Sequence, residues 1–215
     1  DVIKACGSIA QELKRFSALT ERDVIEKNRI ISSVKKAIDE ITEMTEIPGF
    51  ANLFFSSELY LYFHVLVALP DNNISASFIS ILCDIAEDTN NIERIIKENI
   101  IEFALKSCEM LDEVNIQSDA QFLYSTFELI SIVIDGCDDS KTLAEKLLKE
   151  TNILALITRQ FERDDFDDNV LSASELLAIL LQLSPSLIKT IDIKLVNLVI
   201  NFCANMRKTR QAAED

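Results

Sequence analysis

The sequence contains few of the residues that build tight turns, with only 3 Gly and 3 Pro in 215 residues. β-Hairpins and glycine-rich phosphate-binding loops depend on such residues, and neither a GxGxxG nor a Walker pattern occurs. Hydrophobic residues still make up 48% of the chain, which predicts a packed fold. Because Val and Ile recur at three- and four-residue spacing, that fold is expected to be helical.

Residue patterns for catalysis and metal binding are also missing. His64 is the only histidine, and we expect it to pack or to lie partly exposed on a helix. A Ser or Cys triad therefore has no support. The acidic stretch "RDDFDDN" fails the EF-hand pattern, since Val170 replaces its Gly and Leu176 its final Glu. We predict a protein that is not an enzyme and that needs no cofactor or metal.

The cysteines lack the spacing of a metal site. None of the five forms a CxxC pair; they are Cys6, Cys83, Cys108, Cys137 and Cys203. Their odd number within apolar runs predicts reduced, buried thiols and a nuclear or cytosolic location. No signal peptide is visible, and "LLAILLQL" is far shorter than the roughly 20 apolar residues of a membrane span.

Positive charge is scarce. The chain has 21 basic and 36 acidic residues, a net charge of −15. This argues against direct binding of nucleic acid, which requires a positive face. It favours partners with basic, Lys/Arg-rich segments, and the alternative is that the charge serves solubility alone.

A short helix, an apolar helix and a longer amphipathic helix recur in this order, and the first apolar helix is expected at residues 58–69. The long helices are expected at residues 33–46, 75–88, 118–135 and 172–183. Capping boxes of the form S-x-x-E/Q begin the last two, at Ser118 and Ser172. Their starts lie roughly 42, 43 and 54 residues apart, near the 40–47 of armadillo or HEAT units, with an insertion at residues 136–152.

The three-helix order is that of armadillo units, because HEAT units have two helices. We predict an all-α, armadillo-like right-handed α-solenoid of about four to five three-helix repeats. Residues 1–32 are expected to form N-terminal capping helices, and residues 33–215 a single continuous repeat domain. A last partial repeat is expected to begin at Pro185, with Ser184 as its cap.

Four segments carry a family resemblance: "IDEITEMTEIPGFANLF", "LVALPDNNISASFISILCDIAEDT", "CEMLDE" and "SELLAILLQ". Together they resemble the beta-catenin-like armadillo family of nuclear, splicing-associated proteins over roughly residues 33–200. The resemblance implies a nuclear scaffold that associates with the spliceosomal complex built around a ubiquitin-ligase-type scaffold and a Myb-domain partner. It also implies recognition of basic, nuclear-localisation-like segments. The chain lacks the family's usual basic N-terminal segment and later repeats, so we expect a fragment or a reduced version.

Acidic residues follow the outer faces of the predicted long helices. Stacking of the repeats would align them into a ladder for an extended Lys/Arg-rich peptide. The candidate residues are Glu43, Glu46, Asp84, Glu87, Glu128, Asp135 and Glu175. The alternative is an ordinary solvated helix face. Because the chain has no Trp, it lacks the aromatic slots of importin-type armadillo grooves.

The last predicted helix, "IKLVNLVINFCANM", is apolar over most of its circumference. A helix of this kind is expected to be covered on more than one side. We predict contact with another copy of the chain, giving a homodimer through the C-terminal end, or with later repeats. Val199 and Ile200 are the candidate contact residues.

These observations lead to one functional hypothesis and one alternative. We predict a non-enzymatic scaffold of a nuclear pre-mRNA splicing complex that binds basic segments of partner proteins through an acidic groove. The alternative is a transport adaptor for basic, nuclear-localisation-type cargo, which a basic autoinhibitory arm would favour. The expected location is the nucleus, with the cytoplasm as a second location.

Overall fold

The computed structural model describes residues 2–163, 167–189 and 191–214, except the side chains of 187, 188 and 208–214. Residues 164–166 of the acidic turn in "RDDFDDN" therefore lie outside the described residues. The chain divides into an N-terminal unit, Asp1–Asp138, and a C-terminal unit, Asp139–Asp215. Each unit is described by itself below.

Helices make up the regular structure of both units. The N-terminal unit contains α1 (Val2–Ala18), α2 (Val24–Thr42), α3 (Phe50–Ser56), η1 (Glu58–Tyr62), α4 (Phe63–Leu66), α5 (Asn72–Ala86), η2 (Thr89–Asn91), α6 (Ile92–Lys97), α7 (Ile100–Ser107), η3 (Cys108–Met110) and α8 (Gln117–Gly136). The C-terminal unit contains α9 (Ser140–Glu150), α10 (Ile153–Phe161), α11 (Asp168–Leu183), η4 (Pro185–Lys189) and α12 (Ile193–Glu214). The described residues include no strand, so the all-α prediction is confirmed.

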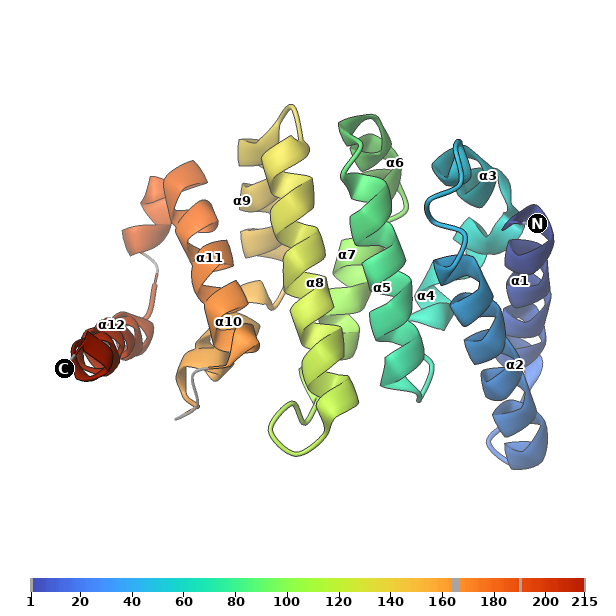
Figure 1. Ribbon diagram of the computed structural model, residues 1–215, viewed down its shortest axis with the longest axis horizontal. Coiled ribbons are helices and arrows are strands. Elements are labelled where there is room, and N and C mark those ends of the chain that lie inside the picture. Colours follow the sequence, from blue (N-terminus) through green and yellow to red (C-terminus); the bar gives the residue numbers. More distant parts are fainter. Residues whose placement is uncertain (1, 164–166, 190, 215) are drawn as a thin grey trace. The chain divides into compact units, whose positions relative to one another are not determined.

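The predicted order of two helices followed by a longer one is present in both units. It runs from α3 to α5 and from α6 to α8 in the N-terminal unit, and from α9 to α11 in the C-terminal unit. In the N-terminal unit the long helices α2, α5 and α8 lie side by side as one layer, with the shorter helices behind them (Figure 1). This layer presents one continuous face built from the long helix of each repeat.

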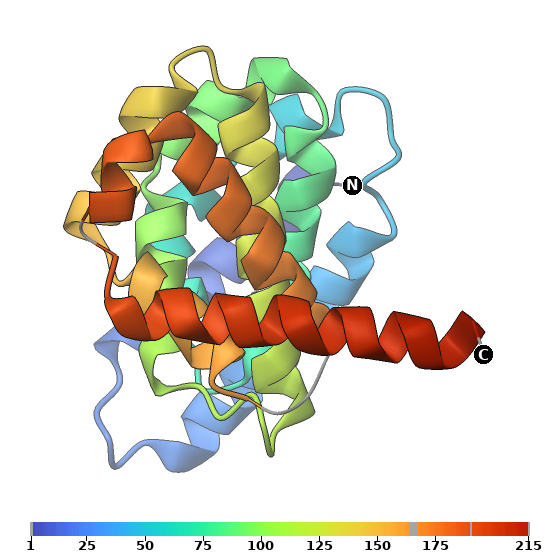
Figure 2. The ribbon, with the colours of Figure 1, turned by 90° about the vertical axis from the view of Figure 1, so that its left-hand side faces the viewer.

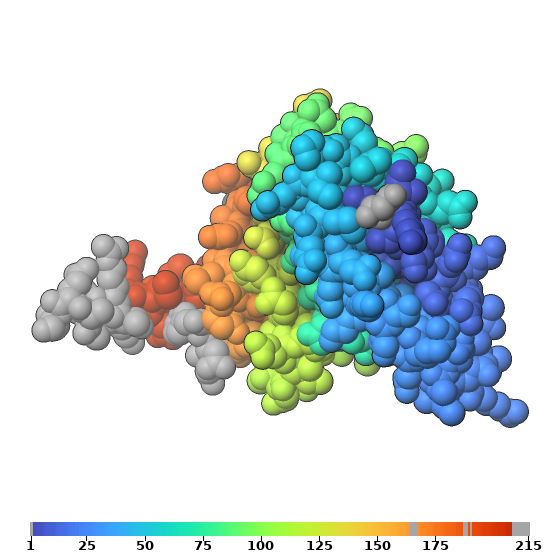
Figure 3. Space-filling model, turned by 45° about the vertical axis from the view of Figure 1, so that its right-hand side comes forward, coloured from blue at the N-terminus to red at the C-terminus, as the bar shows by residue number. Residues whose placement is uncertain are grey.

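One end of the N-terminal unit is formed by the α1–α2 hairpin, coloured blue in Figure 3. Ion pairs from Arg15 to Glu26 at 2.6 Å and from Arg29 to Glu12 at 3.4 Å link the two helices. The first long helix was predicted at residues 33–46, and both ends are wrong. It begins at Val24, because its buried stripe extends back to Ile30, and it ends at Thr42.

Both predicted capping boxes are wrong. α11 begins at Asp168, where the carboxylate of Asp167 accepts from the backbone N–H of Val170 at 3.1 Å. α8 begins at Gln117 without a side-chain cap. There the buried Asp119 carboxylate accepts from the N–H of Asp112 at 2.7 Å and from the Asn72 amide at 2.8 Å. Asp119 thus ties the start of α8 to the first residue of α5.

The apolar run 58–69 does not form the single helix expected from its sequence. It divides at Tyr62 into η1 and α4. Phe63 lies fully inside the unit, with its ring centroid 4.9 Å from that of Phe78 and 5.8 Å from that of Phe54. Tertiary packing of these rings therefore decides the local backbone, as it commonly does for short segments.

Two glycines stand where a side chain would be costly. Gly49 ends the turn after α2 with φ of +78°, a conformation that suits glycine. A Cβ at Gly136 would lie 2.3 Å from Cδ1 of Ile92, so Gly136 allows the end of α8 to approach the start of α6. Gly49 directs α3 back toward α5 and thereby shapes the pocket described below.

In the C-terminal unit, α12 is one long helix (Figure 2) that packs against α10. The Phe161 and Phe202 rings meet edge to face at 5.3 Å, and Lys194 forms an ion pair with Glu162. No described helix meets the length and hydropathy needed to cross a bilayer.

The prediction of buried cysteines holds for three of the five. Cys6, Cys83 and Cys108 are buried, whereas Cys137 is half-buried and Cys203 is exposed on α12. The prediction is wrong for Cys203 because only one side of α12 is covered within its own unit.

Phe78→Ala should destabilise the N-terminal unit by about 3–5 kcal/mol, because it removes a fully buried ring from the Phe54–Phe63–Phe78 cluster. Urea unfolding followed by tyrosine fluorescence reports on this unit alone, since the chain has no Trp and all three tyrosines lie in it. Phe103→Ala is the matched control, with a side chain that is 39% exposed. Equal losses in the two variants would contradict this assignment of the core.

Candidate partner-binding face

Small side chains lie at one part of the contact between α5 and α8. The hydroxyl oxygens of Ser80 and Ser125 lie 3.4 Å apart, and the Cys83 thiol donates to the Ser125 carbonyl at 3.8 Å. Such residues allow two helices to approach closely. The next outward positions are Asp84 on α5 and Glu128 on α8, so close packing places two carboxylates beside each other.

The electrostatics of this pair follow from its position. Burial raises the pKa of Asp84, and repulsion from Glu87 raises it further, while the Thr45 hydroxyl acts in the opposite direction. Burial and the neighbouring Asp84 likewise raise the pKa of Glu128. We call Asp84, Glu87 and Glu128 the acidic face. Its charges repel one another and are partly removed from water, so a cation would relieve both costs.

The other predicted members of the ladder are placed differently. Glu43 caps the C-terminus of α2, and Glu46 lies in the turn beyond it instead of on a helix face. Both are exposed, and Thr45 between them reaches Asp84. Asp135 is exposed near the end of α8. Glu175 is exposed on α11 in the C-terminal unit.

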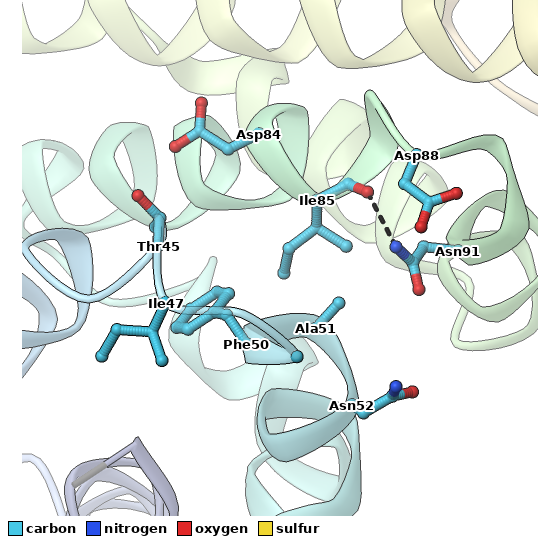
Figure 4. A pocket seen from close by; sticks show the side chains of 10 residues that line it. Thr45, Ile47, Phe50, Ala51, Asn52, Asp84, Ile85, Asp88 and Asn91 are labelled. Carbon is cyan, nitrogen blue, oxygen red and sulfur yellow. Dashed lines mark hydrogen bonds between the residues drawn. The ribbon is translucent and has the colours of Figure 1, made fainter.

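A pocket of about 230 Å³ adjoins the acidic face in the N-terminal unit. Figure 4 shows it between the turn after α2, the start of α3 and the end of α5. It is lined by Thr45, Ile47, Gly49, Phe50, Ala51, Asn52, Asp84, Ile85, Asp88 and Asn91. No signal in the sequence indicated this pocket, because its walls come from segments that lie far apart in the chain.

Neither a metal site nor a buried histidine is found among the described residues. They contain no group of three or more His, Cys, Asp or Glu side chains placed to hold a metal ion. His64 is exposed, and its ring lies 5.7 Å from that of Phe103. The structure thus places the only histidine on a surface, next to an aromatic ring.

The C-terminal helix carries an exposed apolar stripe on α12. Ile193, Val196 and Ile200 are 70%, 39% and 59% exposed, whereas Leu195 is buried and Val199 is half-buried. Of the two predicted contact residues, Ile200 therefore faces outward.

A family model described as "Catenin-beta-like, Arm-motif containing nuclear" matches residues 32–215. The chain belongs to this catenin-beta-like family. The match confirms the family resemblance predicted from the sequence and agrees with the repeated helices of both units. No curated protein and no solved structure matches the chain.

In this catenin-beta-like chain, Asp84→Asn or Glu128→Gln should stabilise the N-terminal unit at pH 7. The folded-state pKa of each carboxyl is raised, so the ionised side chain weakens the fold above that pKa. The penalty disappears as the pH falls through the raised pKa toward about 4. Because both groups are partly exposed and screened by water, the expected gain is only about 0.2–1 kcal/mol.

Urea unfolding at pH 7 and pH 4, followed by tyrosine fluorescence, measures this gain. Asp135→Asn removes an exposed carboxylate from α8 and serves as the control for net charge. A gain that persists undiminished at pH 4 would show that ionisation is not its cause.

Proposed function

We propose that the protein is a non-enzymatic scaffold that binds Lys/Arg-rich segments of partner proteins through its acidic face. The supporting observation is the grouping of Asp84, Glu87 and Glu128: burial and Glu87 raise the pKa of Asp84, and burial and Asp84 raise the pKa of Glu128. Proteins seldom bring like charges together without a use, and an approaching ammonium or guanidinium group would offset the repulsion. The net charge of −15 favours the encounter with a basic segment.

The partners we propose are components of a pre-mRNA splicing complex in the nucleus. The family is described as nuclear, and its Arm motif is generally used for protein interaction instead of catalysis. The resemblance noted in the sequence implies the association with splicing. A transport adaptor for basic cargo is the second candidate, supported by the same acidic face. Co-purification of the intact protein with splicing components would support the scaffold, and co-purification with transport factors would support the adaptor.

Reversing two charges of the acidic face should weaken binding of a Lys/Arg-rich peptide. We expect Asp84→Lys combined with Glu128→Lys to lower affinity at least about tenfold, since it replaces two attractions by two repulsions. Wild-type affinity should also fall steeply between low salt and 0.15 M, where the screening length is about 8 Å. Fluorescence anisotropy of a labelled peptide measures both effects.

The control reverses two exposed acids elsewhere in the N-terminal unit, Glu21→Lys and Glu93→Lys, and changes the net charge equally. If both double variants weaken binding to the same extent, the effect comes from overall charge. If the face variant binds as wild type does, the acidic face is not the binding site.

For the C-terminal unit we propose self-association through the exposed stripe of α12. Exposed apolar patches commonly mark interfaces, and the Ile200 side chain of this stripe is 59% exposed. Light scattering across a concentration series should show a dimer that Ile200→Glu shifts toward monomer. Asn201→Glu adds the same charge at an exposed position of α12 outside this stripe and should leave the dimer intact. A wild-type chain that stays monomeric at every concentration would refute this interface.

A further inference from the structure

The pocket beside the acidic face has a mixed lining, with an apolar part and a larger polar part. Ile47, Phe50 and Ile85 form the apolar part, and Asp84 and Asp88 carry carboxylates at its edge (Figure 4). Its volume of about 230 Å³ is below the range of about 300–1,000 Å³ that is usual for small-molecule sites. The size suits one long side chain better than a whole ligand.

Negative charge at this pocket is not neutralised by the protein itself. No described Lys or Arg forms an ion pair with Asp84 or Asp88. The pocket also lies at the C-terminal end of α5, where the helix dipole is negative. The last turn of α5 contains no basic residue that would offset this dipole.

An acceptor inside the pocket is also left open. Asn91 is only 8% exposed, and its amide nitrogen donates to the Ile85 carbonyl at 3.1 Å. No described residue donates a hydrogen bond to its side-chain oxygen, which Figure 4 shows directed away from the Ile85 bond. The oxygen is therefore an acceptor at the pocket that a ligand's N–H group could use.

The nearest described cation is engaged elsewhere. The Arg94 guanidinium donates to the Asn52 amide oxygen at 2.9 Å and lies over the Phe55 ring, 4.4 Å from its centroid. These two contacts hold Arg94 on the Asn52 side of the pocket. They leave the Asp84 and Asp88 carboxylates available to a charge from outside.

We propose that this pocket receives a single Lys or Arg side chain of the bound basic segment. The aliphatic stem would lie against Ile47, Phe50 and Ile85, as long basic side chains commonly cover apolar surface. The cationic head would meet the Asp88 carboxylate and donate to the Asn91 oxygen beside it, and Asp84 on the other side of Ile85 would add a more distant attraction. This inference rests on the proposed function and deepens it. The pocket fixes which residue of the segment lies at this point of the surface. Tryptophan side chains cannot serve this purpose here, because the chain contains no Trp.

The test combines a peptide scan with pocket variants of the full chain. In a Lys/Arg-rich peptide that binds wild type, each Lys is replaced in turn by norleucine and each Arg by citrulline, which removes charge but keeps length. One position should be far more sensitive than the rest, at about a tenfold loss of affinity. Exchanging Lys and Arg at that position shows which head group the pocket prefers.

Two variants change the pocket without reversing charge. Ala51→Leu fills it from α3, and Asp88→Asn removes one carboxylate while keeping an acceptor for the Asn90 N–H. Both variants should bind the parent peptide with lower affinity. In both, substitution at the sensitive peptide position should cause a smaller loss of affinity than it does in wild type. The controls are Ala5→Leu, at a half-buried alanine of α1, and Asp71→Asn, at the carboxylate that caps α5.

The outcomes separate this inference from the function on which it rests. If reversal of Asp84 and Glu128 weakens binding but neither pocket variant does, the acidic face binds the segment and the pocket inference is overturned. A peptide scan in which every position loses the same affinity would also overturn the pocket inference. If the reversal has no effect either, both proposals fall. Tyrosine fluorescence verifies that Ala51→Leu is folded, and Asp88→Asn tests the pocket even if it is not.

Discussion

Close packing of α5 against α8 is the interaction on which the rest of the N-terminal unit depends. Small groups at the contact, Ser80, Cys83 and Ser125, let the two long helices approach, and the buried aromatic cluster behind them holds α5 in place. The same contact sets Asp84 beside Glu128. The acidic face is therefore a direct product of the core: wider spacing of the helices would separate the charges and let water screen them.

In the proposed binding mode, the acidic face and the pocket have different roles. Exposed and partly exposed carboxylates would attract a basic segment from a distance but would discriminate poorly between its residues. The pocket beside Ile85 and Asn91 would add a requirement for the length and position of one side chain. Membership of the catenin-beta-like Arm-motif family is compatible with such a binding role, because that fold presents long helices as a surface instead of enclosing a reaction site.

The C-terminal unit presents a different kind of surface. Its last helix buries Leu195 and pairs Phe202 with Phe161, yet Ile193, Val196 and Ile200 remain exposed along one stripe. An apolar stripe and an acidic face favour different partners. Binding at the stripe is stabilised by removing apolar surface from water, and binding at the acidic face by attraction to positive charge. The two proposed interactions, with a basic segment and with a second copy of the chain, should therefore respond to different substitutions.

The sequence by itself determined the helical class, the order of short and long helices, the family and the acidic character, because each follows from local periodicity or composition. Helix ends were misjudged where a buried stripe or an earlier carboxylate prevailed, as at Val24 and Asp167, and Phe63 broke an expected helix to join the aromatic core. Only the tertiary structure decided that Asp84 and Glu128 are neighbours, that Glu46 leaves the helix, and that Ile47, Phe50 and Asn91 enclose a pocket. These facts depend on contacts between distant segments, which no local pattern in the chain records.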